Sequence, residues 1–149
     1  MSACMFIGHH DCSSNIMPTL KKAILNLIIN EKVQIFYIGT NGNFDYFAYK
    51  ILCELEKSYN IKFYVVLAYL DKQKSTEYYS AANCVFPDVL ENTPLRYAIV
   101  KRNIYMIEKS NYMICYINHT FSNTYTFVKK AKSKKLQIIN TGELNINKI

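Results

Sequence analysis

The sequence predicts an α/β fold in which a mostly parallel central sheet lies in a three-layer arrangement between helices. Short, nearly continuous apolar runs recur along the chain, as expected of strands that are buried on both faces. Longer segments between these runs repeat their apolar residues with the period of an α-helix. Alternation of the two patterns indicates parallel strands joined by right-handed crossovers.

Six apolar runs are predicted to form the strands. Each is separated from the next by a segment of helical or polar character, so hairpins between neighbouring strands are not expected. The runs are Ala3–Ile7, Val33–Ile38, Ile61–Leu67, Cys84–Phe86, Tyr112–Ile117 and Leu136–Ile139.

Four helices are predicted between these strands. In each of them, apolar residues three and four positions apart form one stripe, and polar residues occupy the opposite face. The predicted helices are Leu20–Ile28, Phe44–Leu55, about Leu95–Ser110 and Thr124–Ala131. Residues 69–83 form a long polar excursion, which in α/β folds is often part of a site, and the polar residues 145–149 are expected to fray.

The composition indicates one globular domain over residues 1–149. The chain is 50% hydrophobic and 19% charged, and a domain of this length buries roughly two-thirds of its surface without disulfides or a structural metal. Disorder and collagen are therefore excluded, and the five scattered cysteines are expected to be reduced, buried thiols. The apolar runs are too short to cross a membrane, and the first has no basic residue before it, so a cytoplasmic location is expected.

The net charge of +7 raises the possibility of nucleic-acid binding, but one cluster accounts for much of it. Lys129, Lys130, Lys132, Lys134 and Lys135 lie on the last helix and its exit, and without them the balance is only +2. We interpret this cluster as a solvated face, away from the strand ends. Nonspecific nucleic-acid binding is the alternative, and it is not favoured.

The segments that follow the strands are the first place to look for a site, because ligands of open parallel sheets bind beyond the carboxyl ends of the strands. Three of the four glycines lie there, in Gly8-His9-His10-Asp11 and in Gly39-Thr40-Asn41-Gly42. A helix that begins near Phe44 would direct free N–H groups at an anion such as phosphate. The alternative is that the glycines only form a tight turn.

Arg102, Asn103 and Met106 follow Ile99 by three, four and seven positions. In a helix this spacing places Arg102 and Asn103 on the same face as the apolar Ile99 and Met106. An inward arginine needs an anionic partner, which is either a ligand phosphate or an internal carboxylate such as Asp45. Asp45 itself either compensates the dipole of its helix or binds a ribose hydroxyl.

Ser122, Asn123 and Thr124 are either an N-cap cluster or a second phosphate site. His9, His10, Cys12 and His119 have no spacing typical of a metal site, so no metal and no cofactor are expected, and a single histidine touching a ligand is favoured. The sequence contains no nucleophile elbow and no Walker loop.

Three motifs resemble the small single-domain SLOG proteins, in particular the YpsA-like group. They are Phe6-Ile7-Gly8-His9-His10-Asp11-Cys12, Phe36-Tyr37-Ile38-Gly39-Thr40-Asn41-Gly42-Asn43-Phe44-Asp45, and Arg96-Tyr97-Ala98-Ile99-Val100-Lys101-Arg102-Asn103 with Met106-Ile107. The resemblance runs from Phe6 to about Asn140. It implies a Rossmann-like fold and a pocket for a nucleotide or nucleotide-derived ligand.

The chain also departs from these families. His10 stands where SLOG proteins usually have Arg, Asn43 where they have a second Gly, and Ser122-Asn123 where they have a Gly pair. Arg102 and Met106 resemble a helix of the Lonely-guy phosphoribohydrolases. The glycine-rich motif of those enzymes is absent, and no Glu lies between Lys109 and Glu143 to match their acid.

Our first hypothesis is therefore a binding module that senses or sequesters a nucleotide-derived molecule and forms a homo-oligomer. The alternative is a nucleotide N-glycosidase in which Asp45 replaces the missing Glu and acts with Arg102. In the binding hypothesis Asp45 takes a ribose hydroxyl, and Arg102 with Lys101 faces the phosphate. The remaining candidate ligand-binding residues are Gly8, His9, His10, Gly39, Thr40, Asn41, Gly42, Asn103, His119, Ser122, Asn123 and Thr124.

Overall fold

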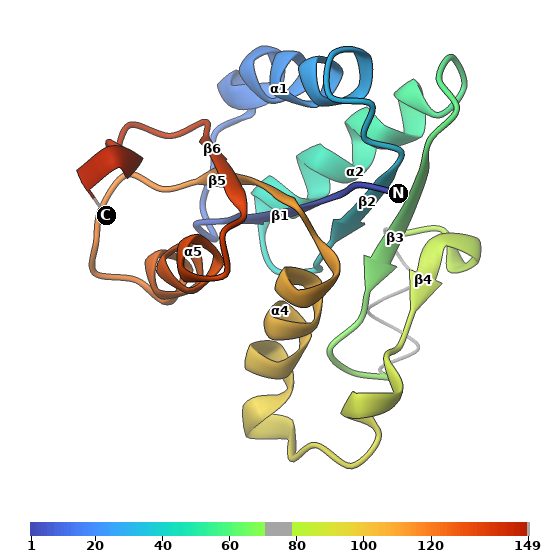
Figure 1. Cartoon of the computed structure of the whole chain (residues 1–149). Helices are drawn as coiled ribbons and strands as arrows, with labels where there is room; N and C mark the ends of the chain where they lie inside the picture. The colour runs from blue at the N-terminus through green and yellow to red at the C-terminus, as the bar shows by residue number, and fades with distance from the viewer. Residues whose placement is uncertain (71–78, 149) are drawn as a thin grey trace.

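The computed structural model describes residues 1–70 and 79–148 of the chain. It contains a six-stranded sheet in the order β4-β3-β2-β1-β5-β6, and every pairing between these strands is parallel (Figure 1). The predicted fold class is confirmed. The strands are β1 (Ala3–Gly8), β2 (Ile35–Ile38), β3 (Lys62–Val66), β4 (Cys84–Val85), β5 (Tyr112–Tyr116) and β6 (Gln137–Asn140).

The helices cover both faces of the sheet (Figure 1). They are α1 (Met17–Ile29), α2 (Asn43–Leu55), α4 (Ala98–Lys109) and α5 (Asn123–Ser133). Cys4 and Phe6 of β1 pack with α1 and α2, whereas Met5 and Ile7 pack with α4 and α5. Because successive strand residues point to opposite faces, a nearly continuous apolar strand supplies both cores.

Two helix starts differ from their predictions, and a proline stands at each. The first helix begins at Met17 rather than Leu20, because Pro18 fits the first helical turn, where its missing N–H is not needed. The third begins with a 3-10 turn, Leu95–Tyr97, and α4 follows at Ala98. Pro94 is extended and sets the start of that turn.

The described residues also form five 3-10 helices, and the Leu95–Tyr97 turn is one of them. The other four are Ser14–Ile16, Ala81–Asn83, Asp88–Leu90 and Ile146–Lys148. Residues 71–78 of the predicted polar excursion lie outside the described residues, as does residue 149 of the predicted tail.

The five cysteines are unpaired, as expected. Cys4, Cys12 and Cys115 are buried, and Cys53 and Cys84 are half-buried. Burial raises the pKa of the Cys115 thiol to about 12, which makes it an unreactive core residue. None of the helices in the described ranges has both the length and the apolar character that a membrane span requires.

Candidate functional site

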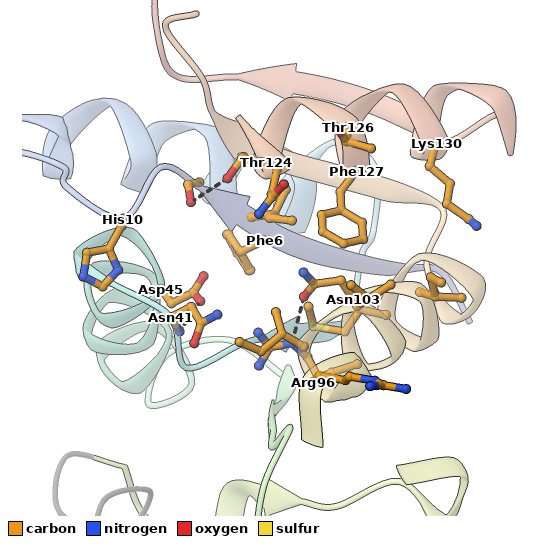
Figure 2. Close-up of a pocket in the computed structure, with 18 residues that line it drawn as sticks. Phe6, His10, Asn41, Asp45, Arg96, Asn103, Thr124, Thr126, Phe127 and Lys130 are labelled. Atoms are coloured by element: carbon orange, nitrogen blue, oxygen red, sulfur yellow. Dashed lines mark hydrogen bonds between the residues drawn. The ribbon is translucent and has the colours of Figure 1, made fainter. Parts of the chain in front are cut away.

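A cavity of about 630 Å³ lies at the carboxyl ends of the strands, between α2, α4 and α5 (Figure 2). Its size is typical of a small-molecule site, and its position matches the rule for open parallel sheets. Its lining comprises Phe6, Ile7, Gly8, His10, Asn41, Asp45, Arg96, Ile99, Val100, Arg102, Asn103, Ile104, Met106, Asn123, Thr124, Thr126, Phe127 and Lys130.

The turn from β2 into α2 forms one wall of the cavity, and its backbone conformation requires a glycine at position 42. Gly42 precedes α2 with φ +95°, a conformation that side chains rarely adopt. The Asn43 N–H donates to the His10 carbonyl oxygen at 3.1 Å. That N–H group is therefore not free for an anion, which corrects part of the predicted phosphate loop. The tight-turn alternative describes Gly42 better.

Arg102 points inward from α4, as its helical position predicts, and is only 1% exposed. Its Nε donates to Asn103 Oδ1 at 2.7 Å, and its Nη1 donates to the Val66 carbonyl oxygen at 3.1 Å. Burial lowers the Arg102 pKa, and the neighbouring carboxylate of Asp45 opposes that shift. The guanidinium is thus held by two neutral acceptors and by a nearby opposite charge.

Gly39 lies between the side chains of Arg102 and Asp45. A Cβ at this position would come within 2.9 Å of Arg102 Cζ and 3.0 Å of Asp45 Oδ2. In the described structure no nitrogen of Arg102 lies within 4.0 Å of an oxygen of Asp45, so the two side chains do not form an ion pair. Part of the predicted alternative therefore holds: Arg102 faces an internal carboxylate, but across a gap rather than in direct contact.

Asp45 is the most unusual group in the cavity. It is 5% exposed, and its Oδ2 accepts the Asn41 N–H at 3.0 Å. Its Oδ1 is buried and has no hydrogen-bond partner among the described residues. Burial raises the pKa of Asp45 to about 6, while Arg102 and the Asn41 N–H act against that rise. A buried oxygen without a partner is rare, and the residue that carries this one lines the cavity.

The N-terminus of α5 closes another side of the cavity. Ser122 Oγ accepts the Tyr125 N–H at 3.1 Å, which confirms the N-cap interpretation for Ser122. Thr124 Oγ1 donates to the Gly8 carbonyl oxygen at 3.2 Å and so ties this helix to β1. Asn123 and Thr124 line the cavity, and Ser122 does not.

His9 and His119 contact each other rather than the cavity. Their rings stack with centroids 4.2 Å apart, and the Phe121 ring stacks on His119 at the same separation. The Asn118 N–H donates to His9 Nε2 at 2.9 Å. Burial and the neighbouring His119 lower the pKa of His9. Within the described residues, no three side chains of His, Cys, Asp or Glu gather as metal ligands.

Two predictions about cations are corrected. Lys101 is exposed and does not line the cavity, because the adjacent position of a helix points about 100° away from Arg102. Lys130 is exposed, as predicted for a solvated face, but it also lines the cavity, so it does not lie away from the strand ends. It stands seven positions after Asn123, and this spacing places both residues on one face of α5.

The structure therefore brings about half of the predicted site residues to one cavity. Those that line it are Gly8, His10, Asn41, Asp45, Arg102, Asn103, Asn123 and Thr124. Those that do not are His9, Gly39, Thr40, Gly42, Lys101, His119 and Ser122.

The additional lining residues had not been proposed as ligand-binding residues. Most come from α4 and α5, and Val100, Thr126 and Lys130 among them are exposed. In α5 the helical spacing from Asn123 relates Thr126, Phe127 and Lys130. They are Phe6, Ile7, Arg96, Ile99, Val100, Ile104, Met106, Thr126, Phe127 and Lys130.

Comparison with known proteins identifies a shared fold. No family model and no curated protein matches the sequence. Among solved structures, the chain is similar to the X-ray structure of DNA processing protein A (DprA) from Streptococcus pneumoniae, with a TM-score of 0.68 and 14% sequence identity. The match covers 93% of this chain and 50% of that one, so the chain spans about half the length of that protein. The likeness shows a Rossmann-like, three-layer fold.

Proposed function

We propose that this chain is a SLOG-like protein that binds a nucleotide or nucleotide-derived signalling molecule, as a sensor or a sequestering protein. The observation that carries the proposal is the unpartnered Oδ1 of Asp45, buried at the edge of a cavity of about 630 Å³. A ribose hydroxyl is a donor of the kind this oxygen lacks. The shared Rossmann-like fold agrees with the SLOG resemblance of the three sequence motifs.

The surroundings of Asp45 suit such a ligand. Arg102 stands nearby and favours the ionised carboxylate, which is the stronger acceptor. Phe6, Met106 and Phe127 supply an apolar wall against which a planar base can pack. The cavity thus combines one directed polar contact with apolar surface, as ligand sites commonly do.

The test uses the purified full chain incubated with nucleoside monophosphates, NAD, ADP-ribose species and cyclic oligonucleotides. Mass spectrometry then identifies what is retained and what is released. We expect one compound to be retained intact, and Asp45→Asn to weaken its binding about tenfold or more. Asp88→Asn is the matched control, because Asp88 is exposed and does not line the cavity. A folded Asp45→Asn protein with unchanged affinity would overturn the proposal.

Nucleotide N-glycosidase activity is the second candidate, and the pKa of Asp45 favours it. A carboxyl group with a pKa of about 6 can both donate and accept a proton near neutral pH. In the same experiment a free base would accumulate with time, and Asp45→Asn would abolish its release. Retention of an intact compound with no free base excludes this candidate for that compound.

A further inference from the structure

We propose that His9 and His119 form an acid-sensitive pair that holds residues 118–122 against the end of β1 and releases them when His9 takes up a proton. The inference goes beyond the proposed function, because neither histidine lines the cavity and no ligand takes part. It gives a role to two side chains that the binding proposal does not use.

The pair is part of a stack of aromatic rings. The His119 ring stacks on the rings of His9 and Phe121, with centroids 4.2 Å apart in each case and interplanar angles of 9° and 16°. The Tyr116 ring contacts His9 edge-on, with a centroid distance of 6.0 Å. Both histidines are half-buried, whereas Phe121 is 83% exposed. The exposed Phe121 ring therefore packs on the histidine pair.

The hydrogen bonding of His9 requires its neutral form. The Asn118 N–H donates to His9 Nε2 at 2.9 Å, so this nitrogen carries no hydrogen. A protonated imidazole carries a hydrogen on both nitrogens, which turns this acceptor into a donor. Protonation of His9 therefore breaks the hydrogen bond and leaves the Asn118 N–H facing another N–H group.

The surroundings of His119 also favour a neutral ring. His119 Nδ1 is buried and has no hydrogen-bond partner among the described residues. A positive charge on His119 would place an N–H at that atom without an acceptor, directly beside the His9 ring. The stacked arrangement thus suits two uncharged rings. In agreement with this, burial and the neighbouring His119 both lower the pKa of His9.

No anionic partner compensates a charge on His9. The titratable residues on the segments packed around it are His10 and Asp11 after β1, Asp45 on α2, Tyr116 and His119 at the end of β5, and Glu143 after β6. Within the described ranges, no carboxylate oxygen lies within 4.0 Å of a histidine nitrogen. A protonated His9 therefore loses its hydrogen bond without gaining an ion pair.

The released segment leads directly into the wall of the cavity. Ser122 caps α5, and the next two residues, Asn123 and Thr124, line the cavity. Thr124 Oγ1 also donates to the carbonyl oxygen of Gly8, the residue before His9. Release of residues 118–122 should therefore loosen the N-terminus of α5 and change the shape of the cavity on this side.

The test follows the backbone amides of residues 118–122 by NMR on the full chain, between about pH 8 and about pH 5. In the wild type these signals should share one midpoint below pH 6.5, the ordinary histidine value. Protection of the Asn118 N–H from hydrogen exchange should fall about fivefold or more across it. His9→Gln should abolish the midpoint, because a glutamine side chain does not titrate. His119→Phe keeps a flat ring in the stack without the charge, so it should raise the midpoint.

Asp45→Asn and His10→Gln are the controls, because each removes another titratable side chain of the same region and leaves the pair intact. Both should keep the wild-type midpoint. A midpoint lost in either control would assign the transition to that group and overturn the inference. Wild-type amides that do not titrate, or a midpoint that persists in His9→Gln, would overturn it as well. Simultaneous loss of protection at Phe6 and Ile114 would show unfolding of the sheet and refute a local release.

Discussion

At the scale of single residues, the buried carboxyl group of Asp45 costs the fold stability. Its carboxyl group is buried, accepts one backbone N–H, and leaves the second oxygen without a partner. A leucine or alanine at this position of α2 would avoid the cost of that desolvation. Asp45 Oδ2 supports the turn before α2, and the proposed ligand would give Oδ1 the hydrogen-bond donor that it lacks among the described residues.

The raised pKa of Asp45 makes its effect on stability dependent on pH. The folded state holds the proton of this group more tightly than the unfolded chain does, because the pKa rises from its ordinary value of about 4 to about 6. Tighter proton binding by Asp45 therefore stabilises the folded state fully below about pH 4, and this stabilisation is lost as the pH rises through 6. It contributes about 3 kcal/mol to the free energy of unfolding.

Asp45→Asn should remove this dependence. We expect the free energy of unfolding of the variant, relative to the wild type, to rise by about 3 kcal/mol between pH 3 and pH 7. Urea unfolding at four pH values across this window measures it, with Asp88→Asn, a substitution of an exposed aspartate, as the control. A flat difference for Asp45→Asn would show that the Asp45 carboxyl group keeps its ordinary pKa.

At the scale of elements, the turn between β2 and α2 positions the site. Gly42 takes the positive φ that reverses the chain, and Gly39 leaves room for Arg102 and Asp45. A side chain at Gly39 would displace one of these buried groups, and both are constrained by hydrogen bonds.

Gly39→Ala should therefore destabilise the fold by about 1–3 kcal/mol, a typical cost of overpacking. Chemical denaturation of Gly39→Ala and of Gly39→Ala combined with Arg102→Met measures this cost in both backgrounds. If the clash is with the guanidinium, the alanine costs less when Met replaces Arg102. An equal cost in the two backgrounds would assign the strain to the backbone or to Asp45.

Elements were predicted from the sequence better than the details of the site. Apolar periodicity located the strands and helices, because burial on the sheet imposes it. The same periodicity identified the inward side of Arg102 and, in the last helix, placed the lysines mainly outside. Lys130 is exposed as that pattern predicts, but it also lines the cavity, which the pattern did not indicate. His9 and His119 were placed correctly at the strand ends, but their mutual stacking depends on loop conformations that no periodic pattern encodes.

At the scale of the whole molecule, exposed apolar side chains mark a surface beside the cavity. Leu95, Tyr97 and Val100 are 74%, 48% and 43% exposed, and Val100 also lines the cavity. Apolar side chains that gather in one place often mark an interface between proteins. We expect this surface to join two copies of the chain.

Sedimentation velocity should accordingly detect a dimer or a higher homo-oligomer at micromolar concentration. Leu95→Glu should dissociate it, because a buried charge without a partner is costly at an interface. Ile29→Glu is the control, since Ile29 is also an exposed apolar residue, 48% exposed, and lies at the end of α1. A wild-type monomer, or equal dissociation by both substitutions, would contradict this expectation.

The central position of β1 also has a consequence for biosynthesis. Cys4 of β1 pairs with Phe36 of β2 on one side and with Tyr112 of β5, much later in the chain, on the other. The Asn111 N–H also donates to the Ala3 carbonyl oxygen. While the ribosome is still adding the intervening segment, a nascent sheet of β1, β2 and β3 would keep one edge of β1 unpaired. An unpaired apolar edge recruits other strands, so the rate of elongation and access to chaperones should govern how much of the chain reaches its native state.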